Sequence, residues 1–145
     1  MTQFQLGSIS TGTLRTEDLL EAFASTLQQF NRTHPLLGEY LDIHANDAWD
    51  SDKAADLLNE GFFNALQEIC PPFVYFGTLE GDGSDFGFWP DMETLNDALD
   101  PTSCLSHQQS NGEYVLQDEN VMVQVSDHGN VTVMDLERNV IWSVV

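Results

Sequence analysis

The spacing of apolar residues changes at Cys70-Pro71-Pro72, and this change constrains the fold more than any other feature of the chain. Before the two prolines, apolar residues recur at the three- and four-residue intervals of a helical face. After them, aromatic and valine-rich runs alternate with polar residues, a pattern typical of strands. Because proline cannot continue a helix, the pair marks the boundary. The sequence predicts an α+β fold, with two to three helices packed on one face of an antiparallel β-sheet.

The first predicted helix runs from about Glu17 to Asn31. Thr16 is its expected N-cap, and acidic residues follow in the first turn, where the helix dipole favours them. Its apolar stripe consists of Leu20, Phe23, Leu27 and Phe30. The next stretch, Pro35 to Trp49, fits a short helix about as well as an irregular packed segment.

A second helix is predicted after Ser51, which can serve as its N-cap, and it ends before the two prolines. Gly61 lies in its middle, where glycine costs roughly 1 kcal/mol relative to alanine. We therefore expect another segment to approach the helix closely at this position. A short helix is also predicted from Asp91 to Leu99.

Two groups of strands are predicted after the prolines. Phe73 to Leu79 and Asp85 to Trp89 form a hairpin around the glycine-rich connection Glu80 to Ser84. The last third of the chain forms a meander with short connections. Its strands are expected at Glu113–Gln117, Val121–Ser126, Val131–Leu136 and Asn139–Val145. We expect the hairpin (73–89) and the meander (113–145) to belong to the same sheet.

The 145-residue length is close to the commonest domain size, so a single domain spanning residues 1–145 is expected. No apolar run approaches the ~18–20 residues that span a bilayer, and the chain starts without a signal-peptide pattern. We therefore expect a cytoplasmic protein. Cys70 and Cys104 have no CxxC partner, which is more typical of buried thiols than of a disulfide or zinc site.

The charge is the feature that bears most on function. The chain has 24 Asp and Glu residues against 4 Lys and Arg, a formal net charge of -20. Such a molecule repels nucleic acid and anionic lipid. We therefore expect no direct contact with nucleic acid or membrane, and a basic protein as the partner.

Two stretches of the chain are densely acidic. The first contains Glu39, Asp42, Asp47, Asp50, Asp52, Asp56 and Glu60, and the second contains Glu80, Asp82, Asp85, Asp91, Glu93, Asp97 and Asp100. Phosphates follow one another at about 3.4 Å of rise along a strand of B-form DNA, so closely spaced surface carboxylates can imitate their field. These residues are the predicted contacts to a nucleic-acid-binding protein. The alternative is that the acidity only keeps the protein soluble, as in halophiles.

Aromatic residues crowd the predicted hairpin. Neighbouring side chains of a strand point to opposite faces, so they cannot all enter one core. The predicted partner contacts are Tyr75, Phe86, Phe88 and Trp89. An aromatic patch with an acidic rim suits a protein interface, including a homodimer, whereas burial in the core is the alternative.

Motifs for metal binding or catalysis are weak. Asp82, Ser84 and Glu93 match a calcium loop in spacing, but Phe86 and Pro90 occupy positions where oxygen ligands are wanted. Asp42 and His44 could share a metal if they lay on one strand face. No nucleophile elbow, phosphate loop or dinucleotide motif is present. We expect a non-enzymatic protein without cofactor or metal, and a metal-binding protein or a hydrolase using Asp and His residues is a further alternative.

Three segments carry a resemblance to known sequences: Gly77–Pro90, Ser126–Asp135 and the ending Ile141–Val145. In them the chain resembles small acidic proteins of phages and plasmids, a group with no established activity to carry over. The resemblance implies a mobile-element setting, in which acidic proteins sequester restriction or CRISPR effectors of the host. It therefore favours an inhibitor that acts as a DNA mimic over an acidic interaction module without mimicry.

Overall fold

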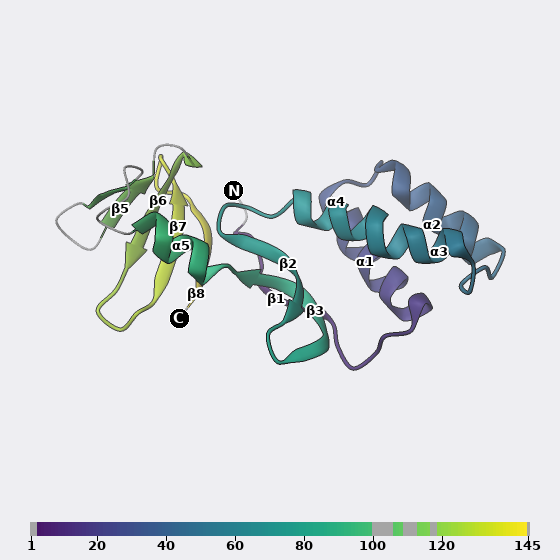
Figure 1. Ribbon diagram of the computed structural model, residues 1–145. Helices are drawn as coiled ribbons and strands as arrows, with labels where there is room; N and C mark the ends of the chain where they lie inside the picture. The colour runs from purple at the N-terminus through teal and green to yellow at the C-terminus, as the bar shows by residue number, and fades with distance from the viewer. Residues whose placement is uncertain (1–2, 100–105, 109–112, 117–118, 145) are drawn as a thin grey trace. The chain divides into compact units, whose positions relative to one another are not determined.

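The computed structural model describes residues 3–99, 106–108, 113–116 and 119–144 (Figure 1). Contacts divide the chain into two compact units. The helical unit comprises residues 7–70 and 75–89, and the sheet unit comprises residues 1–6, 71–74 and 90–145. The single domain expected from the chain length stays a prediction.

The first helix of the helical unit, α1 (Thr16–Phe30), matches the predicted helix within one residue at each end. Its predicted N-cap is wrong, because Arg15 holds the N-cap position and Thr16 is already helical. No side chain caps the helix at Arg15; just before it, Thr13 Oγ1 accepts a hydrogen bond from the Arg15 backbone N–H at 3.2 Å and donates one to Asp18 Oδ2 at 2.7 Å.

The ambiguous stretch contains a helix, α2 (Pro35–Ala45). His34 caps it, because its Nδ1 accepts a hydrogen bond from the Leu36 backbone N–H at 3.2 Å. Pro35 follows at the first helical position, where its missing N–H costs nothing and its fixed φ suits the helix.

The second predicted helix is divided into three consecutive segments. These are α3 (Asp52–Asp56), the π-helix η1 (Leu57–Phe62) and α4 (Phe63–Glu68). The predicted cap is confirmed, because Ser51 Oγ accepts a hydrogen bond from the Ala54 backbone N–H at 3.1 Å. The close approach expected at Gly61 is confirmed as well, since a Cβ at this position would lie 3.5 Å from Leu36 of α2.

The helical unit also contains a three-stranded antiparallel sheet, in the order β1-β3-β2 (Figure 1). The predicted hairpin supplies β2 (Val74–Leu79) and β3 (Asp82–Pro90), and its turn is tighter than expected, with Gly81 at φ 89°. β1 (Gly7–Ser10) was not predicted. Its four residues are too few, and carry too little apolar alternation, to produce a strand signal.

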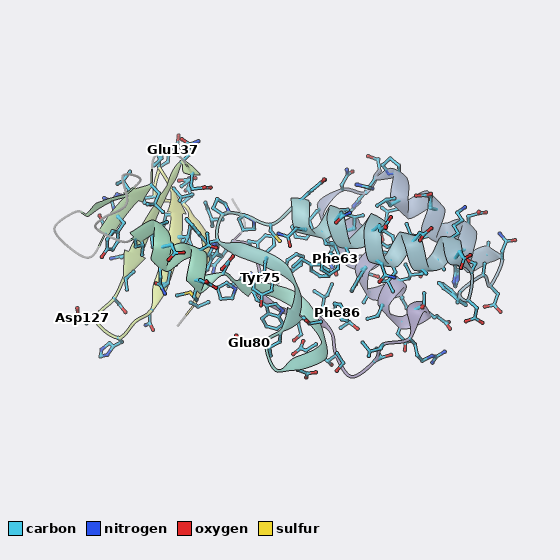
Figure 2. The ribbon with its side chains drawn as sticks, viewed as in Figure 1. Phe63, Tyr75, Glu80, Phe86, Asp127 and Glu137 are labelled. Carbon is cyan, nitrogen blue, oxygen red and sulfur yellow. The ribbon has the colours of Figure 1, made fainter. Side chains whose placement is uncertain are left out.

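Phenylalanines join the helices to this sheet. The ring of Phe76 in β2 lies 5.1 Å from Phe23 of α1, 5.2 Å from Phe63 of α4 and 5.3 Å from Phe88 of β3, measured between centroids. Phe86 of β3 also packs against Phe23, at 5.4 Å. Figure 2 labels Phe63 and Phe86, which lie between the helices and the sheet. The predicted arrangement, helices on an antiparallel sheet in an α+β fold, is confirmed.

Gly87 is required by the close approach of β1 to β3. It pairs with Ser8, and a Cβ on Gly87 would lie 2.8 Å from the Ser8 Cα. We expect Gly87→Ala to lower the free energy of unfolding by about 1–3 kcal/mol, because backbone must move to admit the methyl group. Gly83→Ala on the same strand is the control, since nothing lies within 4 Å of its Cβ position. Equal urea midpoints for the two variants would contradict this account of β1.

The sheet unit contains a five-stranded antiparallel sheet in the order β4-β5-β6-β7-β8. The strands are β4 (Ser106–Gln108), β5 (Glu113–Leu116), β6 (Val121–Val125), β7 (Val131–Asp135) and β8 (Val140–Val144). The predicted meander corresponds to β5–β8, and the predicted short helix is α5 (Met92–Leu99). The hairpin was wrongly expected in this sheet. Strand periodicity shows which segments are extended, but not which strand edges pair.

The core of the sheet unit includes Val123, Val133 and Trp142, all with 0% exposure. The buried indole of Trp142 donates a hydrogen bond from Nε1 to the Pro72 carbonyl oxygen at 2.9 Å. The Asp91 backbone N–H donates to the Phe73 carbonyl oxygen at 2.7 Å. The segment directly after the helices is therefore part of this unit.

Candidate acidic protein-binding surface

All side chains of the first acidic stretch are exposed, and all belong to the helical unit. They come from α2, from the connection that follows it, and from α3 and η1. The residues are Glu39, Asp42, Asp47, Asp50, Asp52, Asp56 and Glu60. These carboxylates are therefore accessible to a partner, and their role as partner contacts stays a prediction.

Three of these carboxylates line one groove. Glu39 comes from α2, Asp56 ends α3, and Glu60 lies in η1. The groove has a volume of about 610 Å³ and is called the acidic groove below; its lining residues are Leu36, Glu39, Lys53, Asp56, Leu57, Glu60 and Gly61. Asp56 and Glu60 are four residues apart in one continuous helical segment, which passes from α3 into the π-helix η1.

Lys53 is the one cation among the described residues that line the acidic groove. Its Nζ lies 3.3 Å from Asp42 Oδ2, and the two side chains are 55% and 63% exposed. An ion pair this exposed contributes little to stability, typically about 0–1 kcal/mol. The pair offsets Asp42, which is not among the residues that line the groove, and Lys53 leaves a net excess of negative charge among the three lining carboxylates.

A second hollow, of about 380 Å³, lies beside the start of α1. Asp47 and Asp50 line it together with Trp49, so these two acids do not belong to the acidic groove. Its acidity is partly offset, because Arg15 Nη2 lies 3.3 Å from Glu17 Oε2.

Three aromatic rings pack together on α2 and on the connection that follows it. The Tyr40 and His44 rings of α2 are stacked at 6.1 Å, and Trp49 lies 6.1 Å from Tyr40. Burial raises the pKa of Tyr40, and the nearby Glu21 and Glu17 raise it further.

The suggestion that Asp42 and His44 share a metal is wrong, because both lie on a helix, where residues two apart do not face each other.

The second acidic stretch is divided between the two units. Glu80 and Asp82 are exposed around the turn of the hairpin in the helical unit, where Figure 2 labels Glu80. Asp85 is half-buried, and its Oδ1 receives no hydrogen bond from the described residues. The remaining members fall elsewhere: Asp91, Glu93 and Asp97 belong to the sheet unit, and Asp100 lies outside the described residues. The stretch therefore forms no continuous surface within one unit.

The aromatic part of the predicted interface needs correction. Phe88 is only 3% exposed and packs against Phe76, so it belongs to the core and cannot contact a partner. Trp89 is half-buried and donates from Nε1 to the Gly77 carbonyl oxygen at 3.0 Å. Tyr75 and Phe86 are also half-buried. Burial of Phe88 against Phe76 is the alternative that the sequence analysis left open for these aromatics.

Metal and thiol chemistry receive no support from the geometry. The segment that resembles a calcium loop is mostly β3, and Ser84 N–H and Oγ both bond to Asp82 Oδ1, at 3.1 and 2.9 Å. Within the described ranges, no group of three or more His, Cys, Asp or Glu side chains is arranged to hold a metal ion. Burial raises the pKa of the Cys70 thiol to about 12, which removes the nucleophilic thiolate at neutral pH. Cys104 lies outside the described residues.

Sequence reasoning misses the floor of the acidic groove. Leu36 and Leu57 read as ordinary members of apolar helical faces, and their place beneath a ring of acids depends on how two helices meet. The signal that could have found it is Gly61, the position where the sequence predicts contact with another segment and where Leu36 of α2 lies nearby.

Comparison of the chain with protein-family models, curated proteins and solved structures gives no match. None of the helices in the described part of the chain is long and apolar enough to cross a membrane.

Proposed function

We propose that the chain is a non-enzymatic inhibitor that binds the basic, nucleic-acid-binding surface of another protein and so excludes DNA or RNA from it. A restriction or CRISPR effector of a bacterial host is the class of target that we propose. The observation that carries the proposal is the acidic groove, where Glu39, Asp56 and Glu60 from two helices surround one hollow.

The physical basis is the field of the carboxylates. A protein that binds nucleic acid presents lysines and arginines to phosphates, and a rigid array of carboxylates offers the same groups an alternative ligand. Opposite charge also steers the encounter, and it can raise association rates by roughly 10- to 1,000-fold at low salt. Helices hold such an array better than loops do, because their backbone geometry fixes the carboxylate spacing.

The proposal predicts which proteins the chain captures and how they are released. Nuclease-treated bacterial lysate is passed over the immobilised chain, and the column is then eluted with duplex DNA or with single-stranded RNA. We expect the retained proteins to be nucleic-acid-binding proteins that the added nucleic acid displaces. Retained proteins that stay bound in excess DNA and RNA would instead identify an acidic interaction module without mimicry.

A neutral variant tests whether the acidic groove is responsible. The triple variant Glu39→Gln, Asp56→Asn and Glu60→Gln removes three charges from its rim, and we expect it to retain at least about tenfold less of the captured proteins. The matched control removes the same number of charges from exposed positions of the sheet unit, two of them labelled in Figure 2. Its substitutions are Glu119→Gln, Asp127→Asn and Glu137→Gln. Equal losses in both variants would show that net charge matters and the groove does not.

A further inference from the structure

The acidic groove is more than a patch of negative charge, because it has an apolar floor. Leu36 is half-buried, Leu57 is 5% exposed, and Gly61 lies between them without a side chain. The acids form its rim, with Glu39 on the α2 side and Asp56 and Glu60 on the α3–η1 side. An apolar strip therefore lies between an acid of α2 on one side and two acids of α3–η1 on the other, where Lys53 also lines the groove.

We propose that this groove takes a basic amphipathic helix of the partner, with an apolar side chain on the floor and lysines or arginines along both rims. The proposal rests on the function proposed above, since it names the element of the nucleic-acid-binding protein that is gripped. A complementary ligand must be apolar along its centre and cationic on both sides, because the apolar floor lies between Glu39 on one side and Asp56 and Glu60 on the other.

An apolar strip with acids on both sides suits a helix better than an extended segment. A strand presents one row of side chains to each face, because successive residues alternate. A helix presents several neighbouring rows on one side, where residues three and four apart lie next to each other. Cations four residues apart on the incoming helix advance by about 6 Å and lie on the same side of it, so they can follow one rim of the groove. Helices with basic faces are also a common way of reading nucleic acid.

The test uses two peptides against the full chain. Both are alanine-based helical peptides of ~18 residues, long enough for substantial helicity in water, with identical lysines flanking one face. The first carries leucines at i and i+4 between the lysines, and the second carries alanines there. We expect the leucine peptide to bind at least about tenfold more tightly in fluorescence anisotropy, because only it fills the apolar floor. Equal dissociation constants for the two peptides would overturn the inference.

Variants of the floor then locate the binding. Gly61→Leu fills the groove without changing any charge, and we expect it to abolish the preference for leucine while salt-sensitive binding of both peptides remains. Leu36→Ala should reduce the preference even if the first variant fails to fold, which circular dichroism will reveal. The control is Leu41→Ala on the same helix, at a side chain that is 62% exposed and outside the groove. A leucine preference that survives in folded variants of both floor residues contradicts the proposed site.

The two proposals fail in different ways. If nucleic acid displaces captured proteins but the leucine and alanine peptides bind equally, the function stands and the helix-binding groove is wrong. If the leucine preference is present but captured proteins resist DNA and RNA, the groove stands and the mimicry is wrong.

Discussion

Replacing Phe76 by alanine should lower the free energy of unfolding by about 3–5 kcal/mol, the range expected for a buried phenylalanine. Phe76 is 2% exposed, and its ring contacts Phe23, Phe63 and Phe88. Its loss therefore leaves a cavity where α1, α4 and the three-stranded sheet meet. Urea unfolding followed by circular dichroism measures the change. Because small domains are stable by only about 5–15 kcal/mol, part of the variant could be unfolded at 37 °C.

Phe30→Ala is the matched control for Phe76→Ala. Phe30 undergoes the same chemical change at the end of α1, but its side chain is 48% exposed. We expect the control to cost less than half as much, since less apolar area returns to water. Similar costs for the two variants would mean that Phe76 is not the centre of the core described here.

Replacing Trp142 by alanine should cost a similar amount, about 3–5 kcal/mol, in the sheet unit. Trp142 is fully buried and donates a hydrogen bond to the Pro72 carbonyl oxygen. The variant loses a fully buried large side chain of this core and the hydrogen bond to Pro72. Thermal unfolding measured by circular dichroism provides the test.

Two variants separate the parts of the Trp142 effect. Trp142→Phe keeps most of the apolar volume but removes the N–H donor, so it should recover more than half of the stability lost in Trp142→Ala. Trp49→Ala removes a half-buried tryptophan of the helical unit and should cost clearly less. If Trp49→Ala destabilises the chain as much as Trp142→Ala does, the result would contradict the place of Trp142 in the core of the sheet unit.

Local features of the fold could be predicted from the sequence because short-range rules determine them. Ser51 caps a helix through its own side chain, and the prolines end the helical half of the chain. β1 could not be predicted, because its place depends on Gly87, a residue nearly eighty positions away that leaves room for it. The division of the strands between two sheets could not be predicted either. The hairpin pairs with β1 and the meander pairs with β4, and strand periodicity does not show which edges pair.

The candidate site could be predicted in part. Acidic residues on helices stay in water because burying an unpaired charge is costly, and so the exposure of the first stretch follows from its composition. The second stretch is discontinuous for a structural reason, since the chain passes from the helical unit to the sheet unit near Pro90. Phe88 was misassigned because a half-buried strand and a strand covered by helices look alike in sequence.

The most direct test of the central claim is the salt dependence of affinity. The dissociation constant of the chain for one captured nucleic-acid-binding protein is measured between about 50 and 500 mM NaCl, over which the Debye length falls from roughly 14 to 4 Å. If the acidic groove binds through its carboxylates, affinity should weaken at least about tenfold over this range, and the variant neutralised at Glu39, Asp56 and Glu60 should show a shallower dependence. A dissociation constant that stays the same across the salt range, or an identical slope for the variant, would contradict the claim.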